Sequence, residues 1–507
     1  MEGLGVREEI GSGIFFQYVN SISYVLAGFI FYIYIIHFYS SELVGVVALL
    51  LAIASLLNMV FSLGIGYGMQ HFISYHLGKG EFTKIRNIIT RFSIIGVCLA
   101  LISFIFLYLN APIFTSLFFH SDSYVFLVRL LGIDLFFLVF GSILSGMLVG
   151  LQMFKSQAVW NVVGIIISYC LPVVLLYLFN ETIFIVIGWA TGYAFSSVVY
   201  VILIRSRVVK MDKKGDSMDK DKVIGYAFPI FLASLIGYGA GYVDRFFVSY
   251  LLNLSLLGIY NFALLISSGI GFIVIPFSTI LLPKFSEMYS LDRKGEMRNY
   301  FAKGIELIST IYVPIAMLVA ALSSAILLFL SNSNYLPASI PIIIVLTTSS
   351  IFVSGNIFSV SLQGIRKTKI FLISSSLGLF ANFLLSLFLI PKFQMIGASI
   401  GYSSVSAVAF GILYYYCRKF DVLKFDRRKI AKIYVSAFVM FFTISIIQKI
   451  LLFSPMMLIF YIVLGFAVYS GMIKGLKTFD KDDLEFIMLL IPLWLQRIKI
   501  VISVLFL

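Results

Sequence analysis

The sequence is divided into apolar runs, each long enough to cross a lipid bilayer as one helix. A crossing needs about 20 predominantly apolar residues. The runs lie at about 12–38, 42–65, 88–110, 123–150, 158–179, 182–204, 223–250, 257–283, 304–330, 338–363, 370–390, 396–417, 430–450 and 453–473. We therefore predict an all-α polytopic membrane protein with about 14 transmembrane helices.

The composition excludes an ordinary water-soluble protein. Of the 507 residues, 61% are hydrophobic and 12% are charged, whereas a soluble domain carries roughly a quarter of charged residues. The three cysteines, Cys98, Cys170 and Cys417, fall in or beside apolar runs, so we expect them to be packing residues. The sequence contains no nucleotide-binding loop and no nucleophile motif. We therefore expect no cofactor and no metal.

The net charge of +14 follows the expected membrane topology and does not indicate nucleic acid. The basic residues gather in alternate loops, as at 79–86, 205–222 and 284–303, whereas only Lys392 and Lys449 lie on the opposite side. Lys and Arg in short loops are retained in the cytoplasm. We predict a multi-pass protein of the cell membrane with both termini cytoplasmic.

Short matches recur along the chain at offsets of 209 to 215 residues, for example Gly188 and Gly192 with Gly397 and Gly401. They predict an N-terminal six-helix bundle (1–204), a cytoplasmic linker (205–222), a C-terminal six-helix bundle (223–429), and an extra helix pair with an amphipathic tail (430–507). Since six is even, the two bundles enter the membrane in the same direction. The expected arrangement is a parallel pseudo-twofold repeat.

Charged side chains inside the apolar runs are few, and each is a functional candidate because its burial in lipid is costly. Arg129 and Asp134 lie in the fourth run, and Asp244 and Arg245 in the seventh. Arg129, Asp244 and Arg245 lie at similar expected depths, so we expect them to meet beneath the outer face. Arg129 and Asp134 are about 140° apart around one helix and should not pair.

Polar residues at helical spacing extend this set. Tyr238 and Tyr242 share a helix face with Arg245, and Gln17 and Asn20 share a face of the first run. One interpretation is a structural ion pair that involves Asp244 or Arg129. The other is a substrate site, in which guanidinium groups bind a phosphate or pyrophosphate while tyrosines and amides contact sugars.

Arg91 and Glu306 lie near the cytoplasmic ends of their runs and are 215 residues apart. Residues so close to an end can extend to the interface and stay solvated. As opposite charges at equivalent repeat positions, they are also candidates for a cytoplasmic gate.

The stretch GYVDRFFVSYLLNLSLLGIYNFALLISSG, with LLPKFSEMY after it, resembles the polysaccharide transporter family, the O-antigen-type flippases. The segment LVGVVALLLAIASLLNMVFSLGIGYGMQHFISYHLGKGE is similar to the second span and following loop of that family. These proteins belong to the multidrug, oligosaccharidyl-lipid and polysaccharide exporter superfamily.

The resemblance implies a flippase and not an enzyme. Its substrate would be a lipid-linked oligosaccharide on a polyprenyl or dolichyl phosphate carrier, moved to the outer leaflet by alternating access for surface polysaccharide or glycan assembly. It also implies cationic cavity residues, for which Arg245 is the matching position, and coupling to H⁺ or Na⁺. The expected partners are this substrate and membrane lipid, without nucleic acid.

Two other classes of function remain open, one within the same superfamily and one outside it. A multidrug antiporter or a peptidoglycan-precursor flippase of the same superfamily would share the fold, although multidrug members usually have fewer spans and an acidic site. A membrane glycosyltransferase or ligase would need carboxylates on sizeable external loops. The short external loops here offer only Glu42, Asp122 and Glu181.

Overall fold

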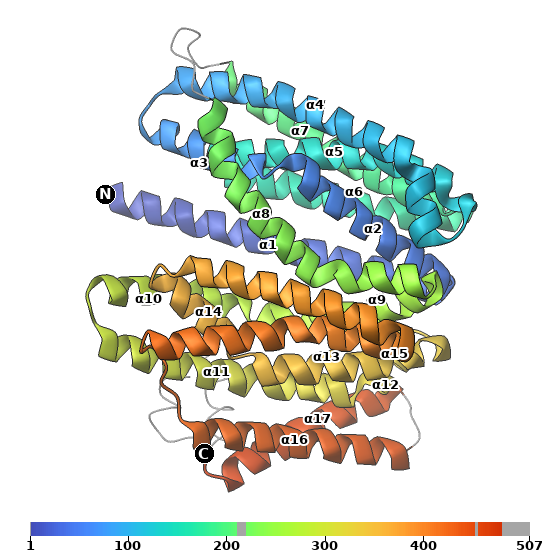
Figure 1. Cartoon of the computed structure of the whole chain (residues 1–507), viewed down its shortest axis with the longest axis vertical. Helices are drawn as coiled ribbons and strands as arrows, with labels where there is room; N and C mark the ends of the chain where they lie inside the picture. Colours follow the sequence, from blue (N-terminus) through green and yellow to red (C-terminus); the bar gives the residue numbers. More distant parts are fainter. Residues whose placement is uncertain (1, 210–219, 452–454, 479–507) are drawn as a thin grey trace. The chain divides into compact units, whose positions relative to one another are not determined.

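The computed structural model describes residues 2–209, 220–451 and 455–478, and within this part every regular element is a helix (Figure 1). The side chains of residues 2–18 are outside the description, as are most of the predicted linker and the tail from residue 479. The all-α polytopic fold expected from the apolar runs is confirmed.

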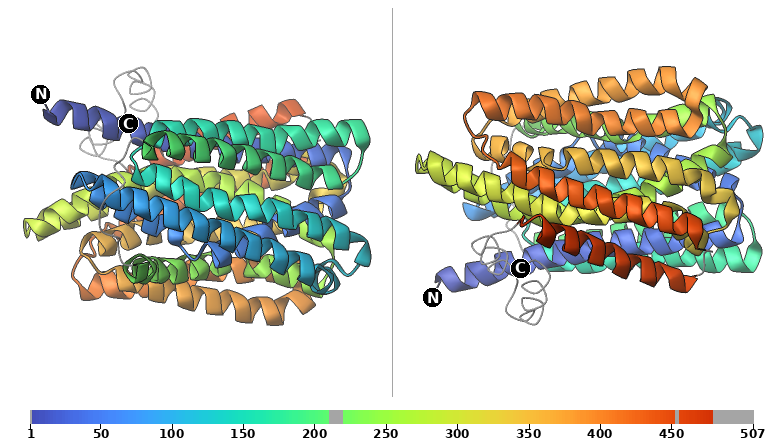
Figure 2. Two further views of the ribbon diagram at one scale, coloured as in Figure 1. Left: turned by 90° about the horizontal axis from the view of Figure 1, so that it is seen from above. Right: turned by 90° about the horizontal axis from the view of Figure 1, so that it is seen from below.

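The chain forms two compact units, Met1–Tyr242 with Asn253–Gly258, and Val243–Leu252 with Ile259–Leu507. The first unit contains α1 (Glu2–Phe38), α2 (Ser41–Ser62), α3 (Ile65–Gly78), α4 (Phe82–Phe114), η1 (Thr115–Phe119), η2 (Asp122–Tyr124), α5 (Val125–Gly150), α6 (Phe154–Phe179), α7 (Ile183–Val208) and the larger part of α8 (Lys220–Leu251). Most of its long helices run side by side, α3 continues in the direction of α2, and α8 crosses obliquely (Figures 1 and 2).

The second unit continues from the end of α8. It holds most of α9 (Leu254–Ile270), then η3 (Gly271–Ile273), α10 (Ile275–Ser290), α11 (Lys294–Ala321), α12 (Ser323–Leu330), η4 (Ser333–Ala338), α13 (Ser339–Phe352), α14 (Gly355–Gly364), α15 (Thr368–Lys419), α16 (Arg427–Ile450) and α17 (Pro455–Gly475). The added helices α16 and α17 pack on each other and on α11.

Among the described residues, 13 helical stretches are long and apolar enough to cross a membrane. One of them, α15, has 52 residues and is interrupted at Gln394, whose φ of 48° and ψ of −127° are not helical. Gly397 packs on the backbone of Leu389, and Gly378 packs on Val405. The chain therefore reverses at Gln394, and α15 is an antiparallel pair that supplies the eleventh and twelfth of the predicted spans.

Small residues bring the two helices of such pairs into close contact. In the first unit, Gly188 of α7 packs on Pro172 of α6, and Gly192 packs on Ser168 one turn away. The equivalent glycines of α15, Gly397 and Gly401, pack in the same way on its first half. Without a hydrophobic effect between helices in lipid, such close backbone approach is a main source of helix association.

Short interruptions separate two pairs of consecutive helices. Leu63 and Gly64 have φ values of 49° and 67°, so α2 ends and α3 begins there. In the second unit, the short helix η3 separates α9 from α10. Leu63 adopts a left-handed conformation that costs a side-chain-bearing residue roughly 1–2 kcal/mol. The surrounding packing therefore has to hold the break in place.

The α6–α7 contact predicts a strong effect of one methyl group. A Cβ at Gly192 would lie 2.6 Å from the carbonyl oxygen of Gly164 and 2.7 Å from the amide nitrogen of Ser168. We expect Gly192→Ala to lower the free energy of unfolding by about 1–3 kcal/mol. Thermal unfolding of the purified protein measures this change.

The matched control is Gly411→Ala in α15, where nothing lies within 4 Å of the added atom. This variant should unfold at the wild-type temperature. Equal midpoints for the two variants would mean that close α6–α7 contact is unimportant for stability.

Candidate functional site

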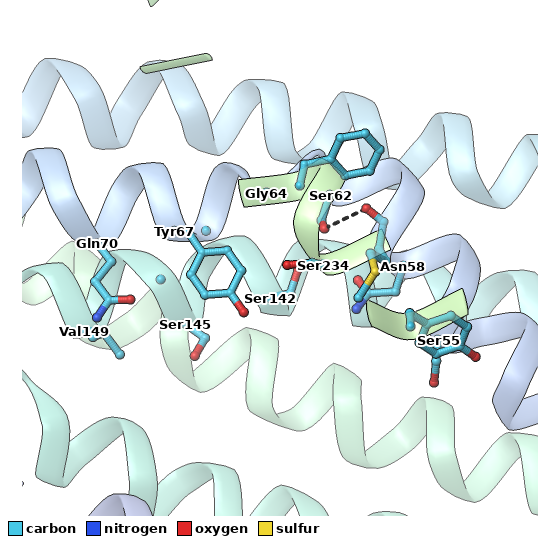
Figure 3. A pocket seen from close by; sticks show the side chains of 15 residues that line it. Ser55, Asn58, Ser62, Gly64, Tyr67, Gln70, Ser142, Ser145, Val149 and Ser234 are labelled. Atoms are coloured by element: carbon cyan, nitrogen blue, oxygen red, sulfur yellow. Dashed lines mark hydrogen bonds between the residues drawn. The ribbon is translucent and has the colours of Figure 1, made fainter. Parts of the chain in front are cut away.

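A pocket of about 430 Å³ opens beside the break between α2 and α3 in the first unit (Figure 3). We call it the α2–α3 pocket. It is lined by residues of α2, α3, α5 and the first part of α8, none of which is Asp, Glu, Lys, Arg or His. The polar lining residues are Ser55, Asn58, Ser62, Tyr67, Gln70, Ser142, Ser145, Ser234 and Tyr238.

Glycines at the break allow α3 to lie close to its neighbours. A Cβ at Gly64 would stand 2.9 Å from the carbonyl oxygen of Ala227 in α8. A Cβ at Gly146 of α5 would lie 2.6 Å from the Cα of Gly66. The backbones of α3, α5 and α8 therefore form the narrow side of the α2–α3 pocket.

Two predicted site residues, Tyr238 and Tyr242, extend from this pocket along α8. The Tyr238 hydroxyl donates a hydrogen bond of 2.6 Å to the carbonyl oxygen of Ala52 in α2. The two rings stack with centroids 4.2 Å apart and planes at 5°. Tyr242 in turn lies close enough to Tyr24 of α1 to interact with it electrostatically. Aromatic side chains thus connect the pocket with the interior of the first unit.

Asp134 is buried close to Tyr24 in the first unit. Its side chain is 1% exposed, and its carboxylate interacts electrostatically with Tyr24 of α1 and Tyr193 of α7. The rings of Tyr24 and Tyr169 form a T-shaped pair with their centroids 6.0 Å apart. Among the described residues, Oδ1 of Asp134 has no hydrogen-bond partner. A buried carboxylate oxygen without a partner costs stability, which is typical of functional positions.

Asn20 is one helical turn from Tyr24 and takes part in a chain of hydrogen bonds. Its Oδ1 accepts a bond of 2.7 Å from Nδ2 of Asn161 in α6, and Oδ1 of Asn161 accepts one of 3.1 Å from the Tyr200 hydroxyl in α7. These bonds fix α1 on α6 and α7. The side chain of Gln17 lies outside the described part of the chain, so its role stays a prediction.

Arg129 lies on the same helix as Asp134 but contacts different residues. Its guanidinium carbon lies 5.2 Å from the centroid of the Tyr108 ring in α4, a cation–π contact. Since Asp134 faces residues of α1 and α7, the structure does not bring these two charges of α5 to one place. The expected meeting of Arg129 with Asp244 and Arg245 stays a prediction, because it joins residues of different units.

Asp244 lies inside the second unit and is 0% exposed. Its Oδ2 accepts a hydrogen bond of 2.7 Å from the Tyr260 hydroxyl of α9, and its Oδ1 accepts one of 3.4 Å from Nδ2 of Asn382 in α15. The Ser386 hydroxyl donates to Oδ1 of Asn382 at 2.9 Å. Both carboxylate oxygens therefore have partners, and three helices share the group.

Arg245 follows Asp244 directly, so its side chain leaves the helix about 100° away. It is partly buried, whereas Asp244 is fully buried, and the two charges interact electrostatically. Asp244 thus fixes the end of α8 in the second unit, while the side chain of Arg245 points away from that of Asp244 around the helix.

The described part of the chain contains no group of three or more His, Cys, Asp or Glu residues that could hold a metal ion.

The two gate candidates have different surroundings. Glu306 is 7% exposed, and its Oε2 lies 3.3 Å from Nζ of Lys303 and 3.8 Å from Nζ of Lys429. The contact with Lys429 joins α11 to the added helix α16 within the second unit. Arg91 lies on the exposed side of α4 in the first unit. A gate between Arg91 and Glu306 stays a prediction.

Apart from Tyr238, the residues that line the α2–α3 pocket were not predicted from the sequence. The prediction started from charged residues within the spans and added polar residues that share a helix face, whereas this lining has no charged residue. The available signal was the spacing of Ser55, Asn58 and Ser62, which places them on one face of α2, with Ser142 and Ser145 similarly placed on α5.

Comparison with known proteins assigns the chain to a family. The sequence model of the family described as "Polysaccharide biosynthesis protein" matches residues 21–340. The uncharacterized membrane protein MJ1068 of Methanocaldococcus jannaschii is 26% identical over 407 residues, which cover 75% of this chain and 78% of that protein.

Several solved structures share this fold. The lipid II flippase MurJ in an inward closed conformation has a TM-score of 0.74 at 18% identity, covering 90% of this chain and 98% of that one. An inward-facing multidrug resistance MATE family transporter of the MOP superfamily has a TM-score of 0.62 at 16% identity, covering 78% and 94%. The resemblance noted in the sequence is confirmed at the level of family and fold.

The two buried aspartates predict opposite effects on stability. Asp244→Leu removes the acceptor of Tyr260 and Asn382, so we expect it to lower the free energy of unfolding by about 2–4 kcal/mol. Asp134→Leu removes a carboxylate with an unpaired oxygen, and stability should be unchanged or higher. Unfolding of both purified variants in nanodiscs measures the difference. Equal losses would mean that Asp134 is as structural as Asp244.

Proposed function

Because the chain belongs to the polysaccharide biosynthesis protein family, whose sequence model matches residues 21–340, we propose that it is a flippase for lipid-linked oligosaccharide. It moves a glycan on a polyprenyl or dolichyl phosphate carrier from the cytoplasmic to the outer leaflet of the cell membrane by alternating access, with both termini cytoplasmic. The family match is the observation that carries this proposal. The fold shared with a lipid II flippase supports it.

The substrate joins an anionic phosphate to neutral sugars, and the chain has groups suited to each part. Guanidinium groups bind phosphate through paired, charge-assisted hydrogen bonds. We assign this role to Arg245, with Arg129 as a second cation. Asp244 acts through its bonds to Tyr260 and Asn382, which hold the α8 segment that carries Arg245.

The polar residues of the first unit are assigned to the glycan and to coupling. Asn20, Tyr238 and Tyr242 offer amide and hydroxyl groups for sugars, as Gln17 would on the same face of α1. Asp134 is suited to exchange a proton, because its carboxylate is buried and has a free acceptor.

Loss of the protein should leave finished substrate on the wrong side of the membrane. When the gene is deleted, we expect complete lipid-linked oligosaccharide to accumulate facing the cytoplasm, as measured by protection from a glycan-cleaving enzyme added outside. Truncated or unchanged glycans would contradict the proposal. Accumulation of a peptidoglycan precursor, or sensitivity to cationic drugs alone, would indicate the related functions of the superfamily.

The role of Arg245 predicts a graded series. Arg245→Ala should reduce export at least about tenfold, since a charge-assisted hydrogen bond contributes roughly 1.5–3 kcal/mol. Arg245→Lys keeps the charge but loses the paired geometry, so its export should lie in between. Export is measured by complementation of the deletion strain at matched membrane expression.

Arg207→Ala is the control for this series, because Arg207 is exposed in the last turn of α7. Its export should equal that of the wild type. Wild-type export by Arg245→Ala would assign Arg245 a purely structural role.

A further inference from the structure

The α2–α3 pocket has the size of a small-ligand site but no charge. Its volume of about 430 Å³ falls within the range of roughly 300 to 1,000 Å³ that holds small molecules. A phosphate or carboxylate placed there would lose its hydration without gaining a cationic partner. The chemistry of the lining therefore excludes the anionic part of a lipid-linked substrate.

The lining instead matches a molecule rich in hydroxyl groups. Serine hydroxyls and the amides of Asn58 and Gln70 both donate and accept hydrogen bonds, as sugar hydroxyls do. The Tyr67 ring adds an apolar face and is 54% exposed, so the pocket is open on the α3 side. In Figure 3 the polar ends of Tyr67, Ser142 and Ser145 face one common space.

One atom of the lining requires a partner. The Oδ1 of Asn58 is buried and accepts no hydrogen bond within the described part of the chain. By contrast, Ser62 and Ser142 donate to backbone carbonyls of their own helices, and Ser145 accepts from Gln157 at 3.1 Å. Unlike these hydroxyl groups, the Asn58 amide oxygen has no partner among the described residues, so it is available to a hydroxyl group that enters the pocket.

The position of these groups excludes contact with lipid chains. Asn58 lies in the candidate membrane span Ser41–Ser62, and Ser145 lies in Asp122–Gly150. Amides and hydroxyls inside a span face the protein interior or a water-filled cavity, because hydrocarbon offers them no hydrogen bonds.

We propose that the α2–α3 pocket is a subsite for an uncharged glycosyl unit of the transported substrate. This inference rests on the proposed flippase function and assigns one part of its substrate to one place. Asn58 and Gln70 bind sugar hydroxyls, Tyr67 covers an apolar sugar face, and the phosphate stays outside the pocket.

The test measures access to the pocket by thiol modification of the full chain in nanodiscs. Cys98 and Cys170 are exposed and are replaced by serine, whereas the buried Cys417 stays. Ser145→Cys is the reporter in the pocket, and Ile94→Cys, which is 62% exposed within the candidate span Phe82–Phe119, is the control. A water-soluble methanethiosulfonate should modify Ser145→Cys and spare Ile94→Cys. If neither Ser145→Cys nor Gln70→Cys reacts, the pocket is closed and the proposal fails.

Three probes then separate sugar from lipid. They are the lipid-linked oligosaccharide pool extracted from the source cells, the glycan that mild acid releases from it, and the lipid phosphate that remains. We expect the intact pool and the free glycan to slow modification of Ser145→Cys about tenfold near nine-tenths occupancy. The lipid phosphate should have no effect. Protection by lipid phosphate, or by none of the probes, would overturn the proposal.

A substitution at Asn58 checks the binding group itself. In the Ser145→Cys background, Asn58→Leu should raise the glycan concentration needed for protection about tenfold, the effect of one lost hydrogen bond in a dry site. Asn110→Leu is the matched control, because that amide donates to Phe106 of its own helix at 2.8 Å. Equal protection in both variants would remove Asn58 from the site.

Native mass spectrometry of the same nanodiscs separates the two proposals. If the intact pool binds the protein but leaves Ser145→Cys unprotected, the subsite is wrong and the flippase function stands. If the pool does not bind, the flippase proposal fails together with its subsite.

Discussion

The peptide groups of this chain have to form their hydrogen bonds within its own helices, because lipid supplies none. This constraint explains why every regular element in the described residues is helical, and it gives special weight to the few places where a helix is broken. At Leu63 and Gly64 the backbone leaves the helix, and the α2–α3 pocket lies directly beside this break. Irregular backbone in a membrane protein is tolerated where it lines a cavity, so the break and the pocket belong together.

The same constraint divides the buried charges into two kinds. Asp244 has hydrogen bonds to both carboxylate oxygens, from helices that approach it from different parts of the second unit. Asp134 is nearly as buried, but one of its oxygens has no partner among the described residues. A satisfied buried charge fixes helices in place, whereas an unsatisfied one retains the capacity to take up a proton or a ligand. Two residues of the same type thus have different consequences for the protein.

Most of the fold could be predicted from the sequence, because helix length and apolarity are local properties. Each span can be recognised from the residues of one apolar run, and the reversal within α15 from the polar residues between two runs. Gly192 and Gly401 can likewise be recognised, each within its own run. The site was predictable in part. Tyr238 and Tyr242 were recognised by their helical spacing, but most other polar residues of the pocket that Tyr238 lines are serines and amides, which their local sequence does not mark. Nothing in their local sequence distinguishes a serine that lines a cavity from one that bonds to its own helix, as Ser62 does.

By itself, the sequence determined that this is a membrane protein with about 14 helical spans, and its motifs indicated the family. Only the tertiary structure decided which polar groups have partners. The hydrogen bonds of Asp244 come from Tyr260 and from Asn382, which is 138 residues away in the chain. The narrow side of the α2–α3 pocket depends on the close approach of Gly66 and Gly146. Insertion in lipid depends on the sum of residue properties along a segment, whereas hydrogen bonding and close packing depend on which side chains of distant segments meet.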